Sequence, residues 1–250
     1  MKRILICVAY DGTDFKGWQL QPSARTVEGE LNKAISELLK KETEVIGASR
    51  TDSGVHALCN MAVFDTEARM PADKYSFAIN TRLPKDVRVR WSKEVAQDFH
   101  PRHTLTEKTY EYHIWNAEFC PPTKRLYAFE ERRPLNVEKM QEAGQYLVGE
   151  HDFKSFSSVA TQAETTVREV TSVDVRREGE EVIISVTGHG FLYNMVRIIA
   201  GTLMWVGLGV REPQDVKLML EACDREKAGP TAPANGLILK DFKFLEIEGK

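Results

Sequence analysis

Residues 43–66, TEVIGASRTDSGVHALCNMAVFDT, set the expected organisation of the first half of the chain. Residues 43–48 and 58–66 are rich in residues that favour strands. Between them, residues 49–56 gather serine, aspartate and glycine, which favour turns. The sequence therefore predicts two strands joined by a loop, with Asp52 near the centre of the loop and Arg50 beside it.

The segments on either side of this stretch alternate between strand and helix patterns. Apolar or alternating runs predict strands, and apolar residues at helical spacing predict a helix that Thr26 caps. Proline opens a second helix, since its fixed backbone is tolerated in a first turn. The order is strand 3–10, helix 26–41, strand pair 43–66, helix 71–81 and strands 87–95 and 108–116. This order resembles a ferredoxin-like unit.

The second half repeats the scheme more loosely. Its predicted elements are a helix at 137–148, strands at 167–177 and 181–188, an apolar helix at 191–205, a shorter helix after Pro213 and a closing strand at 235–244. We expect an α+β protein whose two ferredoxin-like halves join into a mainly antiparallel sheet with a central cleft. The expected halves are residues 1–118, which carry the Asp52 loop, and residues 119–250, which complete the cleft.

Several classes of chemistry are not indicated. The four cysteines include no C-x-x-C pair, and the six histidines lack metal-ligand spacing apart from the weak His100 and His103 pair, so we expect no metal site. Phosphate-cradling glycine motifs are also missing. An apolar start interrupted by Asp11 and Asp14 does not suit a signal peptide, and no apolar run reaches the roughly 18 residues of a membrane span. We expect a cytoplasmic protein without a membrane partner.

The formal net charge of -3 argues mildly against a nucleic-acid partner, because phosphate binding needs clustered Lys and Arg. Basic residues do gather locally, in the segments 82–93, 102–108 and 124–133. A basic face opposite an acidic back is one interpretation, and ordinary solvated charge is the other.

Asp52 is the most unusual candidate for chemistry. A carboxylate between two strands, held outward by turn residues and flanked by Arg50, stays ionised and suits a nucleophile or a base. The alternative is an Asp-Ser-Gly turn with a local ion pair, and the spacing alone favours this structural interpretation.

A set of short blocks carries a resemblance to a known family. The blocks are YDGT at 10–13, GWQ at 17–19, RTVEGE at 25–30, RTDSGVH at 50–56, KTY at 108–110, GFLYNMVR at 190–197 and GPTAP at 229–233. Together, in this order and across nearly the whole chain, they resemble the TruA family of tRNA pseudouridine synthases. Each block alone would be a weak signal.

The resemblance implies the pseudouridine synthase fold and an isomerase activity that needs no cofactor. The implied enzyme is a tRNA pseudouridine(38-40) synthase, which converts uridine to pseudouridine in the anticodon stem-loop of tRNA after flipping the base. The family resemblance also implies a homodimer whose tRNA site is shared between subunits.

The resemblance also implies roles for four residues. Asp52 would be the catalytic aspartate, Arg50 would help to hold the target nucleotide out of its stack, Tyr110 would pack against the flipped uracil, and Arg197 would pair with Asp52. Tyr110 alternates with Tyr112 and could instead be a core residue. Arg197 lies in an apolar segment, where an arginine needs a partner. Whether Asp52 attacks C1′ or removes the C2′ proton stays open.

Two other classes of function fit parts of the sequence. A non-catalytic RNA-binding protein with ferredoxin-like halves would stack bases on Trp18, Tyr110 or Trp115 without reacting. A metabolic enzyme that acts on a small molecule would show no salt-sensitive affinity for RNA.

Overall fold

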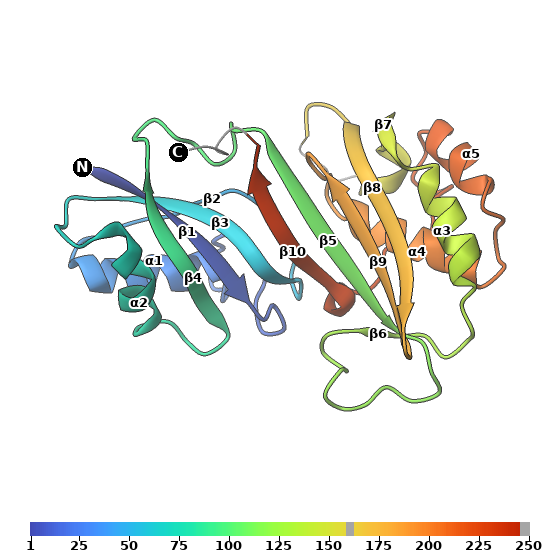
Figure 1. Cartoon of the computed structure of the whole chain (residues 1–250), viewed down its shortest axis with the longest axis horizontal. Coiled ribbons are helices and arrows are strands. Elements are labelled where there is room, and N and C mark those ends of the chain that lie inside the picture. Colours follow the sequence, from blue (N-terminus) through green and yellow to red (C-terminus); the bar gives the residue numbers. More distant parts are fainter. Residues whose placement is uncertain (159–162, 246–250) are drawn as a thin grey trace. The chain divides into compact units, whose positions relative to one another are not determined.

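The computed structural model describes residues 1–158 and 163–245. The chain divides into two compact units (Figure 1). Unit 1 comprises Met1–Thr106 together with the C-terminal strand from Leu239, and unit 2 comprises Glu107–Ile238. Each is an α+β unit whose strand pairs are mainly antiparallel, which confirms the predicted fold class.

Unit 1 is built on a sheet in the order β4-β1-β3-β10. Its elements are β1 (Lys2–Tyr10), α1 (Val27–Leu39), β2 (Ile46–Gly47), β3 (His56–Thr66), the 3-10 turn η1 (Ala72–Lys74), α2 (Tyr75–Asn80), β4 (Val87–Val95) and most of β10 (Leu237–Phe244). Strand β1 pairs antiparallel with both β3 and β4. A continuous apolar run from Ile4 to Val8 suits this central strand, because both of its faces are buried.

Helix α1 follows the predicted pattern closely. The Thr26 side chain accepts a hydrogen bond from the Gly29 amide and so caps the first turn. Val27, Leu31 and Ile35 recur every four residues and are fully buried. The helix ends where Lys40 adopts a left-handed backbone with φ 57°.

The strands of unit 2 follow the order β5-β9-β8-β7. Its elements are β5 (Thr106–Trp115), β6 (Phe129–Glu130), α3 (Val137–Gln145), β7 (Gly149–Asp152), the 3-10 turn η2 (Lys154–Phe156), β8 (Val167–Glu178), β9 (Glu181–Gly188), α4 (Met195–Gly207), α5 (Asp215–Glu221) and the 3-10 turn η3 (Ala234–Gly236). The core helix is α4, in which Ile198, Ile199 and Leu203 are fully buried.

Several predicted bounds were wrong. The apolar helix expected from Phe191 begins at Met195, because Asn194 adopts a left-handed backbone with φ 62°. The helix expected to reach Val148 ends at Gln145, and the unpredicted strand β7 begins at Gly149. Within residues 43–48, only Ile46–Gly47 pairs as a strand.

The predicted division at residues 118 and 119 differs from the bounds of the compact units. Strand β5 belongs to unit 2 from Glu107 onward, where it pairs with β9, and the last strand belongs to unit 1, where it lies beside β3. The roles predicted for the two halves stay predictions, and so does the central cleft. Over the described residues, no helix is both long and apolar enough to pass through a membrane.

Candidate active site

The loop between β2 and β3 carries Arg50 and Asp52, as predicted. Arg50 is exposed and Asp52 is half-buried. The Val55 amide donates to the Asp52 carbonyl at 3.1 Å, and Gly54 adopts φ 81°, so the chain turns tightly just after the aspartate. A turn of this kind presents the Asp52 region at the end of the sheet and not within its core.

A buried polar pair supports this loop from the sheet. Tyr10, the last residue of β1, shares a hydrogen bond of 2.7 Å between its Oη and Thr51 Oγ1. The Asn60 amide nitrogen on β3 donates to the Ser49 carbonyl at 2.9 Å and to Tyr10 Oη at 3.3 Å. Ser49 and Thr51 are therefore both held by side chains of the central strands.

The turn at residues 15–18 supports the loop from another direction. The Trp18 amide donates to the Thr51 carbonyl at 3.0 Å, and the Gly54 amide donates to the Phe15 carbonyl at 3.3 Å. Gly17 adopts φ 90°, and a Cβ there would lie 2.6 Å from the Thr51 carbonyl oxygen. Glycine is required at this position by both its backbone conformation and the close approach.

The end of the loop is joined to the turn that follows β1. The Gly12 amide donates to His56 Nδ1 at 3.0 Å, and Asp11 Oδ1 lies 3.2 Å from the same nitrogen. A Cβ on Gly12 would overlap the Val55 carbonyl. The blocks at 10–13, 17–19 and 50–56 thus form one contiguous structure in unit 1, although roughly 40 residues separate the first from the last.

Tyr110 lies on β5 in unit 2, and only 7% of its surface is exposed. Its ring meets Phe191 edge to face, with centroids 5.2 Å apart at an interplanar angle of 83°. Burial and, to a smaller extent, the charge of Arg168 lower the pKa of Lys108, two residues earlier on the strand, to about 8. The KTY and GFLYNMVR blocks are therefore neighbours, and Tyr110 is mostly covered within its own unit.

Arg197 lies in the first turn of α4 and is half-buried. Its Nε donates to the Ala232 carbonyl at 2.7 Å, and its Nη1 donates to Asn194 Oδ1 at 2.8 Å. The Asn194 amide nitrogen in turn donates to Ser158 Oγ at 2.7 Å. The apolar sequence context of Arg197 predicted that its guanidinium needs partners. The Ala232 carbonyl and Asn194 Oδ1 are two of these partners.

Each compact unit contains two of the four predicted site residues. Arg50 and Asp52 share one loop of unit 1, whereas Tyr110 and Arg197 belong to unit 2. The pairing of Asp52 with Arg197 stays a prediction. Tyr10, Asn60 and His56 support the loop although their sequence context predicted no role for them. Asn60 carried a signal, because it is the one polar residue of the run ALCNMAVF at 57–64.

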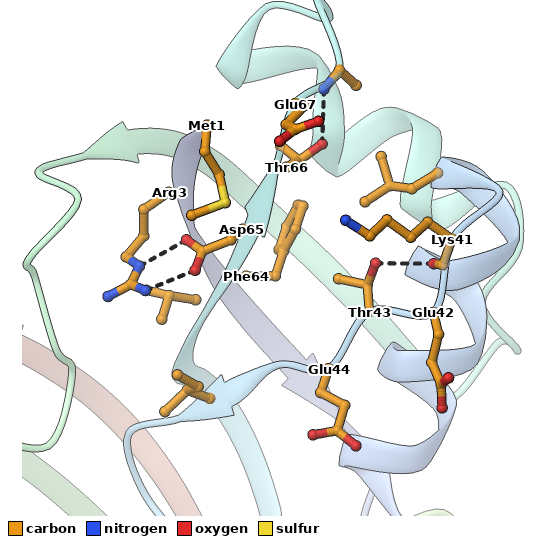
Figure 2. Close-up of a pocket in the computed structure, with 14 residues that line it drawn as sticks. Met1, Arg3, Lys41, Glu42, Thr43, Glu44, Phe64, Asp65, Thr66 and Glu67 are labelled. Atoms are coloured by element: carbon orange, nitrogen blue, oxygen red, sulfur yellow. Dashed lines mark hydrogen bonds and ion pairs between the residues drawn. The ribbon is translucent and has the colours of Figure 1, made fainter.

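A separate cavity of about 430 Å³ lies at the opposite end of β1 and β3 from the Asp52 loop (Figure 2). Arg3 donates two hydrogen bonds to the Asp65 carboxylate there, and Glu42, Glu44 and Glu67 make the lining acidic. None of the predicted site residues lines this cavity. Over the described part of the chain, no group of three or more His, Cys, Asp and Glu side chains could hold a metal ion.

Comparisons with known proteins match segments of both units. Residues 6–103 and 143–244 match a family model described as tRNA pseudouridine synthase. The tRNA pseudouridine synthase A of Brevibacillus brevis is 47% identical over 244 residues, which cover 98% of this chain and 100% of the relative. The tRNA pseudouridine synthase A of Caldicellulosiruptor bescii is 44% identical, again over 98% of this chain and 100% of the relative. The tRNA pseudouridine synthase A 2 of Clostridium perfringens is 43% identical over 96% of this chain and 98% of the relative. The chain belongs to the tRNA pseudouridine synthase family.

Proposed function

We propose that this protein isomerises uridine to pseudouridine in tRNA, at positions 38 to 40 of the anticodon stem-loop. The observation that carries the proposal is the Asp52 loop, which contains the family's Arg-Thr-Asp sequence. Asp52 is half-buried in this loop. Hydrogen bonds from β1, β3 and the turn at 15–18 hold the loop in place. Pre-positioning of this kind is what a reacting carboxylate requires.

The reaction breaks the bond between uracil N1 and ribose C1′, rotates the base and forms a bond between C5 and C1′. The C5 proton passes to solvent and N1 gains a proton, so the atoms balance without any oxidant, reductant or energy source. The Asp52 carboxylate serves either as the nucleophile at C1′ or as the base that removes the C2′ proton. Both roles require its ionised form.

The target base must leave its stack before it can rotate, at a cost of a few kcal/mol. Arg50 is exposed on the Asp52 loop and offers a planar cation that replaces the lost stacking. Tyr110 supplies the apolar surface against which the flipped uracil packs. The edge contact with Phe191 holds its ring in one orientation for this role.

Arg197 is assigned as the partner that stabilises the Asp52 carboxylate. The hydrogen bonds to Ala232 and Asn194 orient the guanidinium in advance, which lowers the entropy lost on forming an ion pair. A partly desolvated pair of this kind keeps the carboxylate charged.

The direct test is release of tritium from tRNA labelled at C5 of uridine, followed by mapping of the modified positions. The wild-type protein is expected to release tritium and to modify uridines 38 to 40. A non-catalytic RNA-binding protein would bind tRNA without release, and an enzyme for small molecules would show no salt-sensitive affinity for tRNA. Modification confined to other uridines would reject the proposed specificity while retaining the activity.

The proposed working form is a cytoplasmic homodimer. With a formal net charge of -3 and basic residues spread over several segments, one chain has limited surface with which to bind a polyanion. Two-fold pairing would bring the basic segment 82–108 of one subunit beside the Asp52 loop of the other.

A further inference from the structure

We infer that Tyr10 and Asn60 form a buried positioning pair that sets the place of Asp52 without touching the substrate. The inference rests on the proposed function, because it assigns a kinetic role to residues beneath the Asp52 loop. Asn60, Tyr10, Ser49 and Thr51 are 0%, 5%, 7% and 7% exposed, so the whole network is shielded from water.

Asn60 uses every polar atom of its side chain. Its two amide hydrogens serve the Ser49 carbonyl and Tyr10 Oη, and its Oδ1 accepts from the Met61 amide at 2.9 Å. A buried amide costs stability unless it is fully hydrogen-bonded, and an apolar residue would continue the run at 57–64 without that demand. The feature that asparagine adds at this position is a defined connection between β3 and the backbone of the loop.

Tyr10 is held as rigidly as Asn60. Its ring packs against Trp18 with centroids 5.9 Å apart, and its hydroxyl lies between Asn60 Nδ2 and Thr51 Oγ1. Burial raises the pKa of the Tyr10 phenol, which therefore stays protonated over the whole physiological pH range. With Thr51 and Asn60 as its partners, the buried phenol acts as a structural hydrogen-bonding group.

The position of Asp52 follows from the bonds at Thr51. The Thr51 carbonyl accepts from the Trp18 amide, and its hydroxyl is joined to Tyr10. The Thr51 carbonyl and the Asp52 nitrogen belong to one planar peptide unit, so holding Thr51 at two points determines where the Asp52 residue begins. Displacing a reacting group by about 1 Å can lower a rate by about 100-fold.

The chain offers a matched control for the removal of a buried tyrosine hydroxyl. Tyr75 on α2 is fully buried in the same unit, and its hydroxyl donates to the Ala68 carbonyl at 3.4 Å, away from the Asp52 loop. Tyr10→Phe and Tyr75→Phe therefore remove the same atom from buried rings of one unit. We expect Tyr10→Phe to lower the thermal midpoint more, because it leaves two buried partners without their hydrogen bonds, so kcat is compared well below both midpoints.

The kinetic results are expected to differ. At saturating tRNA and well below the thermal midpoint, Tyr10→Phe should lower kcat by about tenfold or more while KM stays within about twofold, because only the reacting carboxylate is displaced. Tyr75→Phe should keep the wild-type kcat. Well below both midpoints, a loss of stability alone would lower kcat in neither variant, and a loss of RNA binding would appear in KM.

A double-mutant cycle tests the path through Thr51. Thr51→Val should lower kcat about as far as Tyr10→Phe does, and the double variant should be no slower than the slower single variant, because both changes remove one connection. Thr51→Ser, which keeps the hydroxyl, should lose less than Thr51→Val. If Tyr10→Phe does not fold, Thr51→Val replaces it in the comparison with Tyr75→Phe.

The inference is overturned if Tyr10→Phe keeps the wild-type kcat, if Tyr75→Phe loses as much kcat well below its own midpoint, or if the two losses in the cycle multiply. Failure of the proposed function is a different result, since the wild-type protein itself would then release no tritium.

Discussion

Arg197 and Ala232 are joined by a reciprocal pair of hydrogen bonds. Arg197 Nε donates to the Ala232 carbonyl at 2.7 Å, and the Ala232 amide donates to the Arg197 carbonyl at 3.1 Å. Further along α4, the Gly229 amide donates to Thr202 Oγ1 at 2.8 Å. The segment 229–232 thus runs against the helix and holds the Arg197 side chain in a defined direction.

Arg197→Met is expected to fold and to be inactive. Methionine has a similar length and avoids a stranded cation, and the lost hydrogen bonds to Ala232 and Asn194 should together cost roughly 1–3 kcal/mol of unfolding free energy. Chemical denaturation measures the stability, and tritium release measures the activity. Full activity would show that Arg197 is not the partner of Asp52.

Asp52→Asn should abolish tritium release and leave the fold and the tRNA affinity nearly unchanged. The side chain is half-buried on a loop, and the substitution removes a charge while keeping the shape. The thermal midpoint, filter binding of tRNA and turnover are compared with the wild type. Substantial turnover by the variant would reject the catalytic assignment.

Tyr110→Ala should lose more activity than Tyr110→Phe, because ring stacking survives the loss of the hydroxyl. The ring is 7% exposed and contacts Phe191, so the alanine variant should also lose about 3–5 kcal/mol of stability. Rates are therefore compared per folded molecule, from denaturation curves at the assay temperature. Equal loss of activity in both variants would indicate a chemical role for the hydroxyl.

Acid should weaken unit 1 through Asp65. Hydrogen bonds from Arg3 lower the pKa of the Asp65 carboxyl below its ordinary value. A carboxyl whose pKa is lower in the folded state than in the unfolded state stabilises the fold at any pH above the unfolded-state pKa of about 3.9. This stabilisation is lost as the pH falls through the folded-state pKa. Wild type should therefore exceed Asp65→Asn in thermal midpoint at pH 7, and the difference should shrink below about pH 4. A difference that is constant with pH would contradict this linkage.

The shared tRNA site predicts complementation between subunits. Light scattering should give the mass of a dimer, and a mixture of Asp52→Asn subunits with subunits that carry charge reversals in the segment 82–108 should recover part of the activity. One of the two sites in such a heterodimer would combine an intact Asp52 with an intact basic segment. Affinity for tRNA should fall steeply with salt. A monomeric mass, or no recovery from a proven heterodimer, would reject a shared site.

Local patterns in the sequence were sufficient to predict most helices and strands of the fold. The cap at Thr26 and the spacing of Leu31 and Ile35 predicted α1, and alternation predicted β4 with the bounds observed, Val87–Val95. These features depend on neighbours within a few residues, which a periodic pattern records directly. The loop at 49–56 was predictable for the same reason, since its turn residues are contiguous.

The start of α4 and the support of the Asp52 loop depended on tertiary structure. The left-handed backbone of Asn194 accompanies a hydrogen bond to Ser158, 36 residues away, and no local pattern carries that information. Tyr10, Thr51 and Asn60 meet because β1 pairs with β3 in a register that places Val8 opposite Asn60. The sequence by itself determined which residues are candidates for the site and where the turns fall. Only the long-range register of the strands decided which buried side chains hold the Asp52 loop, because hydrogen bonds between distant residues exist only once the sheet has formed.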